Sequence, residues 1–428
     1  MSEKLVAVFS GGGTGGHLYP ALALSSALEA LRPDVRSVFV GATRGVEARV
    51  LPEKGVEHLL LPVRGVKRGG RLSVVAGAFG VVPSLSSALA RVGRLFRRLR
   101  PRLVVVTGGY AGGPAGLMAG MMGIRLALQE QNSVPGVTTK VLSLWARQIH
   151  LAFPEAVEAL PSSARKRARV TGNPVRPPEH RDRVASRRAF GLDERGTVVL
   201  AVGGSQGAAA VNDALMDAVR RVADGELELP DGLQLLWATG PSHERGVAEA
   251  LEGLGSPPWV RAVGYIDDMP GALASADVAV SRAGAMATSE FLAWGVPAIL
   301  VPLPTAASDH QTRNAAALAA SGAALHLAQQ ELDGASLWGA IVELVQDDMK
   351  RDGMSRAALE RGRPRAATEI AAALAELLPP PAGGNNPTRD TREVASDPGG
   401  AAGAQAGDAA GDTAGGFADA GDADGGRS

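Results

Sequence analysis

Two strand-like runs that each end in a cluster of glycines constrain the fold of this chain most. Residues 6–9 are apolar and lead into the glycine-rich residues 11–16, followed by His17 and an apolar helical segment. The apolar run 197–202 leads in the same way into Gly-Gly-Ser-Gln-Gly at residues 203–207. A strand, a glycine turn and a helix aim several backbone N–H groups at one point, which suits an anion. We therefore predict two similar halves, each with a candidate anion-binding turn.

The first turn also matches the dinucleotide pattern G-x-G-x-x-G through Gly11, Gly13 and Gly16. In that pattern the second strand ends near an Asp or Glu that holds the NAD ribose. Here the strand at residues 37–40 is followed by Gly-Ala-Thr. This disfavours an NAD-dependent oxidoreductase, and a tight turn without a ligand remains the alternative to phosphate binding.

Strand-like and helical segments alternate in both halves, which predicts an α/β fold with parallel sheets. The predicted strands are residues 5–9, 37–40, 103–106, 126–132, 148–153, 197–202, 233–238, 260–265, 278–281 and 298–301. Residues 107–114 are predicted to form a further glycine turn, and the prolines of 174–178 indicate a linker. The expected organisation is a first domain (1–170), a linker (171–180), a second domain (181–378) and a tail (379–428). A ligand cleft is expected between the two domains.

Composition narrows the functional classes. The 428 residues are 45% hydrophobic and 21% charged, which is typical of a soluble α/β protein. Aromatic residues make up 4%, which argues against a stacking surface for nucleic acid, and the absence of cysteine excludes disulfides and thiolate sites. Residues 379–428 are mostly Ala, Gly and Asp, with eight acidic and three basic side chains, and are predicted to be disordered.

The net charge is zero, but the charges are unevenly placed. Residues 58–129 contain eleven Lys or Arg and no Asp or Glu. Inside this stretch an apolar segment, 74–82, lies between basic clusters at 64–71 and 91–98. Such a segment suits either the surface of an anionic membrane or a core helix with a solvated basic face. No apolar run is long enough to span a bilayer, and no signal peptide is expected ahead of the first strand.

Polar groups follow several predicted strands. Glu290, in the glycine-containing stretch 281–290, suits either a sugar diol or the first turn of a helix. The amides of Gln311 and Asn314 suit sugar hydroxyls, whereas the neighbouring Asp309-His310 lacks further metal-ligand partners and is interpreted as loop. Asp267-Asp268 is interpreted as a helix cap rather than a metal pair.

On these motifs the chain resembles the MurG family of peptidoglycan N-acetylglucosaminyltransferases. The resemblance covers residues 5 to about 378. Its motifs, in order, are Gly-Gly-Thr-Gly-Gly-His at 12–17, Glu-Gln-Asn at 130–132, Gly-Asn-Pro-Val-Arg at 172–176, residues 203–207, Ile-Asp-Asp-Met at 266–269, residues 281–290 and residues 309–314.

The resemblance implies a GT-B fold, in which two Rossmann-like domains face each other across a cleft and the last helix packs back on the first domain. It implies a hexosyltransferase that moves GlcNAc from UDP-GlcNAc to the MurNAc 4-hydroxyl of lipid I, undecaprenyl-pyrophosphoryl-MurNAc-pentapeptide. The anomeric centre inverts and lipid II forms, without a metal or other cofactor. Such an enzyme serves cell-wall synthesis, cell shape and division, at the cytoplasmic face of the inner membrane and bound peripherally to its anionic surface.

The resemblance also implies site residues. His17 is the candidate general base, since imidazole titrates near working pH; a helix N-terminal residue that bonds backbone or phosphate is the alternative. The implied contacts to UDP-GlcNAc are Ser205 to pyrophosphate, Ile266 to uracil, Glu290 to ribose, Gln311 and Asn314 to the sugar, Ala285, Met286, Ala287, Thr288 and Ser289 to phosphate, and further Thr14, Gly15, Gly16, Asn132 and Arg176. Ala287 departs from the family pattern, which often has threonine there, and leaves open whether Thr288 supplies the missing hydroxyl.

Two other functions fit the same motifs. One is another UDP-sugar enzyme of this architecture, such as a diacylglycerol glycosyltransferase or a UDP-GlcNAc 2-epimerase. The other is a regulator that binds a nucleotide sugar without turnover. Release of UDP that depends on a lipid acceptor separates the expected transferase from the epimerase and from the regulator.

Overall fold

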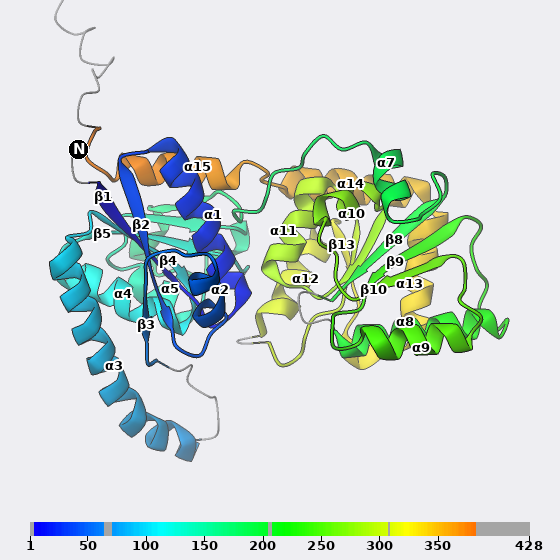
Figure 1. Ribbon diagram of the computed structural model, residues 1–428, viewed down its shortest axis with the longest axis horizontal. Coiled ribbons are helices and arrows are strands. Elements are labelled where there is room, and N and C mark those ends of the chain that lie inside the picture. The colour runs from blue at the N-terminus through cyan, green and yellow to red at the C-terminus, as the bar shows by residue number, and fades with distance from the viewer. Residues whose placement is uncertain (1–3, 64–70, 204–207, 307–308, 382–428) are drawn as a thin grey trace, which may run out of the picture. The chain divides into compact units, whose positions relative to one another are not determined.

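Two parallel β-sheets form the framework of this chain in the computed structural model, which describes residues 4–63, 71–203, 208–306 and 309–381 (Figure 1). The first sheet has the strand order β3-β2-β1-β4-β5-β6-β7, and the second has the order β10-β9-β8-β11-β12-β13. Every neighbouring pair in both sheets is parallel. The predicted α/β class with two parallel sheets is confirmed.

The strands of the first sheet come from the first 170 residues. They are β1 (Leu5–Gly11), β2 (Val35–Ala42), β3 (His58–Leu61), β4 (Leu103–Gly108), β5 (Arg125–Glu130), β6 (Gln148–Leu151) and β7 (Ala168–Val170). The second sheet is made of β8 (Thr197–Val202), β9 (Leu233–Ala238), β10 (Val260–Val263), β11 (Val278–Ser281), β12 (Ala298–Leu300) and β13 (Ala324–His326).

Helices cover both faces of each sheet (Figure 1). One face of the first sheet packs against α1 (Gly15–Leu31) and α15 (Ala366–Glu376), and the other against α3 (Arg71–Leu99), α4 (Gly109–Met121) and α5 (Val137–Leu142). In the second half, one face packs against α8 (Ala209–Ala223), α9 (Glu244–Gly253) and α13 (Gly334–Gln346), and the other against α10 (Met269–Ser275), α11 (Ala285–Trp294) and α12 (His310–Ala320). The remaining helices of the described residues are α2 (Glu47–Glu53), η1 (Pro154–Ala156), α6 (Ser162–Arg165), α7 (Arg183–Ala189), η3 (Gln329–Glu331) and α14 (Asp348–Arg361).

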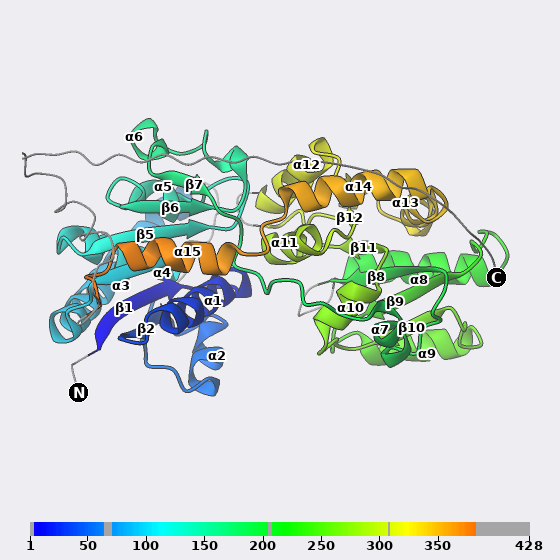
Figure 2. The ribbon, with the colours of Figure 1, turned by 90° about the horizontal axis from the view of Figure 1, so that it is seen from above.

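The last helix, α15, packs against α1, which begins at the first glycine turn (Figure 2). Ile370 and Leu374 of α15 are fully buried there. Side chains of the first half also bond the end of the chain: Gln148 Nε2 donates to the Ala373 carbonyl at 2.8 Å, and Arg32 Nη2 donates to the Pro379 carbonyl at 2.9 Å. The chain therefore returns to its first sheet after completing the second.

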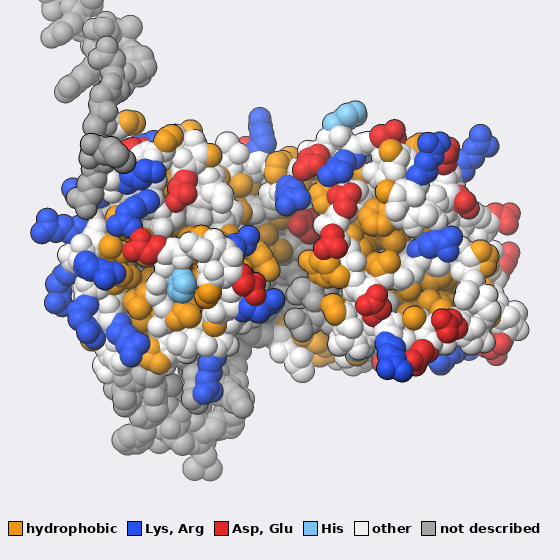
Figure 3. Space-filling view, in the orientation of Figure 1, with side chains coloured by type: hydrophobic (Ala, Val, Ile, Leu, Met, Phe, Trp, Pro, Cys, Tyr) orange, Lys and Arg blue, Asp and Glu red, His pale blue; other side chains and the backbone are white. Residues whose placement is uncertain are grey.

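The C-terminal part of α3 is basic on its outer side. Arg91, Arg94, Arg97 and Arg98 are all exposed, whereas Val92 and Phe96 are buried in the core beneath. Lys and Arg side chains gather on this side of the molecule in Figure 3. The apolar segment 74–82 and the basic cluster 64–71 have no described side chains, so their predicted role lies outside the described residues.

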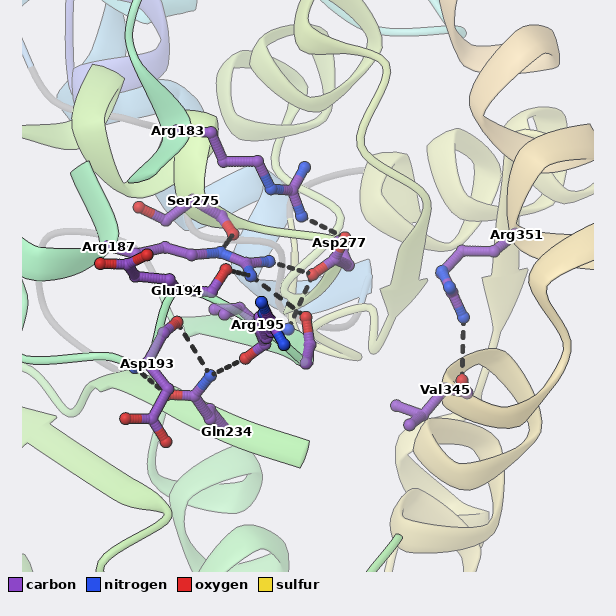
Figure 4. Close-up of polar contacts among 12 residues, drawn as sticks. Arg183, Arg187, Asp193, Glu194, Arg195, Gln234, Ser275, Asp277, Val345 and Arg351 are labelled. Carbon is purple, nitrogen blue, oxygen red and sulfur yellow. Dashed lines mark hydrogen bonds and ion pairs between the residues drawn. The ribbon is translucent and has the colours of Figure 1, made fainter. Parts of the chain in front are cut away.

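The buried side chain of Arg187 links α7 to the second sheet at the edge where the strands begin (Figure 4). Arg187 Nη2 donates to Asp277 at 2.8 Å, and Nη1 donates to the Glu194 carbonyl at 2.8 Å. Asp277 also accepts from the Val198 N–H at 2.8 Å. Because this network lies at the N-terminal ends of the strands, it leaves their C-terminal ends free for a ligand site.

Residues 107–114 were expected to form a glycine turn, and that expectation is wrong. Only Gly108 and Gly109 have positive φ, and α4 runs from Gly109 through the remaining glycines. Close packing accounts for Gly112 in this stretch, since a Cβ there would lie 2.6 Å from Val106 Cγ1. The predicted tail, 379–428, is described only as far as residue 381, so its expected disorder lies outside the described residues.

Candidate active site

The site lies where the order of strands reverses in each sheet. In the first sheet this point is between β1 and β4, where Gly11 pairs with Gly108; in the second it is between β8 and β11, where Val202 pairs with Ser281. Ligands of open α/β sheets bind in the crevice outside the strand ends at such points. Both glycine-rich turns predicted from the sequence start at these points.

His17 lies in the first turn of α1 and is partly buried. Its Nδ1 lies 3.0 Å from Thr14 Oγ1, and its carbonyl accepts from Thr107 Oγ1 at 2.7 Å. Gly108, at φ +98°, lies beside the imidazole, where a Cβ would come within 2.8 Å of Cδ2. Burial lowers the pKa of His17 to about 4, with His310 adding to the effect and Glu47 opposing it. The imidazole is therefore neutral at pH 7 and able to accept a proton.

The first glycine turn is bonded by the side chain of Glu47, a residue that belongs to none of the sequence motifs. Both Glu47 carboxylate oxygens accept from the Gly13 N–H at 3.0 Å, although the side chain is fully buried. The Gly13 N–H is therefore not available to a ligand anion. Phosphate binding by this turn is left to Thr14, Gly15 and Gly16, at the start of α1.

A cavity of about 510 Å³ lies at the second switch point. The N-termini of α8 and α11 both border it, and no side chain of the described residues caps either helix. Arg282 also lines it, and Ser281, next to it, has a buried hydroxyl without a hydrogen-bond partner in the described part of the chain. Two uncapped helix N-termini and a guanidinium favour a phosphorylated ligand. Arg282 was quoted in the 281–290 motif but not predicted as a site residue.

A second cavity, of about 570 Å³, lies on the other side of α11. Ile266, Glu290 and Arg176 line it together, as the resemblance implied, and Met286 joins them. Tyr19 and Lys54 of the first half also border it and were not predicted. Glu290 lies in the second turn of α11, so the first-turn alternative is wrong. Burial raises the pKa of Glu290 to about 7, and Arg176 opposes the shift.

The five residues 285–289 divide between different surroundings. Met286 faces the 570 Å³ cavity and Ala287 faces the 510 Å³ cavity. The Thr288 hydroxyl donates to the carbonyls of Gly284 and Ala285 at 3.1 Å, so it is turned into its own helix. It does not line the 510 Å³ cavity that Ala287 faces.

A buried polar network joins the two halves beside these cavities. Asn173 Nδ2 donates to Ser289 Oγ at 2.9 Å and to the Ala285 carbonyl at 3.2 Å. Asn173 Oδ1 accepts from Gln129 Nε2 at 2.9 Å. Ser289 and Ala285 therefore contribute to the junction between the halves, and Ala285 is buried.

The predicted sugar-binding amides lie in different environments. Asn314 is fully buried: its Oδ1 accepts from the Ser133 N–H at 2.9 Å, and its Nδ2 donates to Asn132 Oδ1 at 3.2 Å. Gln311 lines the 510 Å³ cavity, and its Oε1 accepts from the Leu303 N–H at 2.9 Å. Direct contact of Asn314 with a sugar requires these bonds to rearrange, whereas Gln311 already borders the cavity.

Two further predictions concern charged residues, and one is wrong: Asp309-His310 was interpreted as loop, but His310 is the first residue of α12 and Asp309 precedes it as the N-cap residue. Asp268 caps α10 by accepting from the Gly271 N–H at 3.2 Å, which confirms the cap interpretation. Among the described residues, no group of three His, Asp or Glu side chains is placed to hold a metal ion. Ser205, the predicted pyrophosphate contact, lies outside the described residues.

Comparison with known proteins identifies the family. The model of the glycosyltransferase family 28 N-terminal domain matches residues 7–151, and that of the C-terminal domain matches residues 198–370. A Salinibacter ruber protein is 41% identical over 84% of this chain and 94% of its own length, and one from Chlorobium luteolum is 38% identical over 86% and 98%. Both are named UDP-N-acetylglucosamine–N-acetylmuramyl-(pentapeptide) pyrophosphoryl-undecaprenol N-acetylglucosamine transferase.

Solved structures agree. The crystal structure of Acinetobacter baumannii MurG superposes with a TM-score of 0.69 at 28% identity, over 87% of this chain and 99% of that one. A Staphylococcus aureus MnaA–UDP structure has a TM-score of 0.60 at 14% identity, which supports the fold alone. The expected GT-B fold is confirmed, and the chain belongs to glycosyltransferase family 28 and, within it, to the MurG family of N-acetylglucosamine transferases.

Proposed function

We propose that this chain transfers GlcNAc from UDP-GlcNAc to the MurNAc 4-hydroxyl of lipid I, inverts the anomeric centre and forms lipid II. One observation carries the proposal at the level of the site. The first two turns of α11 separate a cavity lined by Ile266 and Glu290 from a cavity with two uncapped helix N-termini and Arg282. A nucleoside diphosphate needs these two environments side by side: one for base and ribose, and one for phosphates.

The proposed donor pose follows from this division. Uracil lies against the backbone at Ile266, and the ribose hydroxyls bond Glu290, near Arg176. The diphosphate lies at the start of α11, close to Ala287, and the GlcNAc extends toward Gln311. Ser205, Asn132, Asn314 and the residues 285–289 keep the donor contacts that the family resemblance implies, as predictions.

His17 is the proposed general base. The acceptor hydroxyl oxygen attacks C1 of GlcNAc, the bond from C1 to the UDP oxygen breaks, and the hydroxyl proton passes to the imidazole. Its low pKa keeps the imidazole neutral at pH 7 and so free to accept the proton, but it also makes the group a weaker base than an ordinary histidine. Thr14 Oγ1 orients the ring at Nδ1. The UDP leaving group carries its negative charge to the helix N-termini and Arg282.

We also propose that the enzyme works at the cytoplasmic face of the inner membrane, where it binds the anionic membrane surface. An apolar patch on the first half supports this. It consists of large side chains of α4, α5 and the turns that follow them, all exposed: Met121, Met122, Val137, Val141, Leu144 and Trp145. Helix α4 contacts both α5 and α3, whose outer arginines are exposed. Apolar side chains beside cationic ones favour binding to an anionic bilayer. No helix in the described part of the chain is long and apolar enough to span a membrane.

The deciding experiment measures UDP released from UDP-GlcNAc by the purified full chain, with and without a lipid I analogue. We expect release only with the analogue, unaffected by EDTA, and slowed in a His17→Gln variant. Release without acceptor, together with a 2-epimerised sugar, would identify an epimerase instead. Binding of UDP-GlcNAc with no release under either condition would identify a regulator. Unchanged turnover in His17→Gln would remove only the base assignment.

A further inference from the structure

Glu47 is a fully buried carboxylate that no motif or proposed contact accounts for. It is the first residue of α2 and lies beneath the turn that carries His17. Its oxygens accept from the Gly13 N–H and from the Ala42 N–H, each at 3.0 Å. Among the described residues it forms no ion pair with a Lys or Arg within 4.0 Å. Burying a carboxylate is costly unless such bonds compensate it, so the position serves a purpose beyond packing.

The chain closes around this carboxylate from three separate segments. A Cβ on Gly12 would lie 2.2 Å from Glu47 Oε1, and one on Gly45 would lie 2.1 Å from Oε2. A Cβ on Gly41, in β2, would lie 2.6 Å from Glu47 Cγ. These distances are too short for any side chain on the three glycines. The glycine turn, the end of β2 and the start of α2 are therefore shaped to fit Glu47.

The bond to Gly13 sets the shape of the turn just before the proposed catalytic residues. Gly13 has φ +93°, and on its other side a Cβ would lie 2.5 Å from the ring of Tyr110. The next residue, Thr14, precedes α1 and holds His17 Nδ1. Glu47 thus acts on the imidazole in two ways: through the backbone of residues 13–17, and through its charge, which opposes the lowering of the His17 pKa. The bond to Gly13 also fixes the position from which Thr14 to Gly16 lead into α1.

We propose that Glu47 is a positioning residue of the transferase, which holds the turn 11–16 through the Gly13 and Ala42 N–H groups and so places His17 and the start of α1. The inference rests on the proposed function of His17. It assigns Glu47 no contact with substrate. The property that matters is hydrogen-bond acceptance at this point, which a glutamine shares and an alanine lacks.

The test compares Glu47→Gln and Glu47→Ala in the full chain, with Glu53→Ala at an exposed position of α2 as control. UDP release with a lipid I analogue is measured first in the wild type, so a failure of the proposed function is visible before any variant is compared. We expect Glu47→Gln to keep kcat within about threefold of the wild-type value. Glu47→Ala should lower kcat about 100-fold, because a small misplacement of a catalytic group can reduce the rate by that much. The KM for UDP-GlcNAc should stay within about twofold in Glu47→Gln, whereas Glu47→Ala should raise it as well, because the displaced turn carries the implied donor contacts Thr14, Gly15 and Gly16.

The amount of folded enzyme is counted by titration with UDP, which the second half is proposed to bind. If kcat per UDP-binding site is unchanged in Glu47→Ala, Glu47 only stabilises the fold and the proposal is wrong. If Glu47→Gln loses as much kcat as Glu47→Ala, hydrogen-bond acceptance is not the reason. Should Glu47→Ala not fold, Gly45→Ala replaces it, because the added Cβ displaces the carboxylate from outside; we then expect a similar loss of kcat, and an unchanged kcat overturns the proposal.

Discussion

At the scale of single residues, Glu290 connects donor binding with pH. Burial raises its pKa to about 7, so it is protonated below that pH and ionised above it. Only the ionised carboxylate accepts hydrogen bonds from two ribose hydroxyls. We therefore expect the KM for UDP-GlcNAc to rise as the pH falls from 8 to 6. A Glu290→Gln variant should raise KM at pH 8 by about 10-fold to 100-fold, the value of hydrogen bonds to a charged group, and lose this pH dependence.

The control for Glu290 is Glu252→Gln, at an exposed position on α9. It should leave KM and its pH dependence unchanged. A pH dependence of KM that survives in Glu290→Gln would show that another group, such as the donor phosphates, causes it.

The raised pKa of Glu290 has a further consequence, for the stability of the free enzyme. The stability associated with the protonated carboxyl is fully present below pH 4.5, the ordinary value, and is lost as the pH rises through about 7.

The sequence motifs predicted the residues that line the proposed donor cavity better than the residues that position them. Ile266, Glu290 and Arg176 line one cavity, as the resemblance implied. Thr288 and Glu47 show what a motif leaves out. The Thr288 hydroxyl faces its own helix because of its phase on α11, which residue spacing alone does not determine. Glu47 bonds a turn 34 residues earlier in the chain, and this contact between distant segments is seen only in the folded structure.

At the scale of elements, the strands of both sheets were predicted where they are buried on two sides. The strands β3, β7 and β13 were missed, and all three lie at the edge of a sheet. An edge strand is short and packs on one side, so it lacks the long apolar run that marks a central strand. The helix α4 was missed for another reason, because its glycines are typical of turns but here allow close packing against β4 and α5.

The apolar patch of α4 and α5 gives a prediction about membrane binding. Met121 is 75% exposed at the end of α4, which contacts α3, and Trp145 is 49% exposed in the turn after α5, which contacts α4. Replacing both by serine removes apolar area that a bilayer would bury, at about 25 cal/mol per Å². We expect the double variant Met121→Ser/Trp145→Ser to bind vesicles containing anionic phospholipid at least about tenfold more weakly, in a sedimentation assay. Its turnover of a water-soluble acceptor analogue should not change.

The matched control for the patch is Met349→Ser, a methionine that is 84% exposed on α14 in the second half. This substitution removes exposed apolar area outside the patch, so the variant should bind vesicles as the wild type does. If both variants lose the same affinity, or if neither does, the patch is not the membrane-binding surface. Binding should also weaken as the salt concentration rises, since cationic side chains contribute.

At the scale of the whole molecule, the last described helix completes the first half. Helix α15 covers the same face of the first sheet as α1, and β1 and α1 come from the opposite end of the chain. Leu374 is fully buried in this layer, so Leu374→Ala should cost about 2 to 5 kcal/mol of unfolding free energy in denaturant titration. Glu376→Ala, exposed on the same helix, should cost less than about 0.5 kcal/mol. Helix α1 also begins at the turn before His17, so unfolding of the first half should abolish activity. In Leu374→Ala, transferase activity should therefore be lost at the same lowered temperature at which the first half unfolds. If Leu374→Ala proved as stable as Glu376→Ala, α15 would not be part of the first core, and the first half would be complete without the end of the chain.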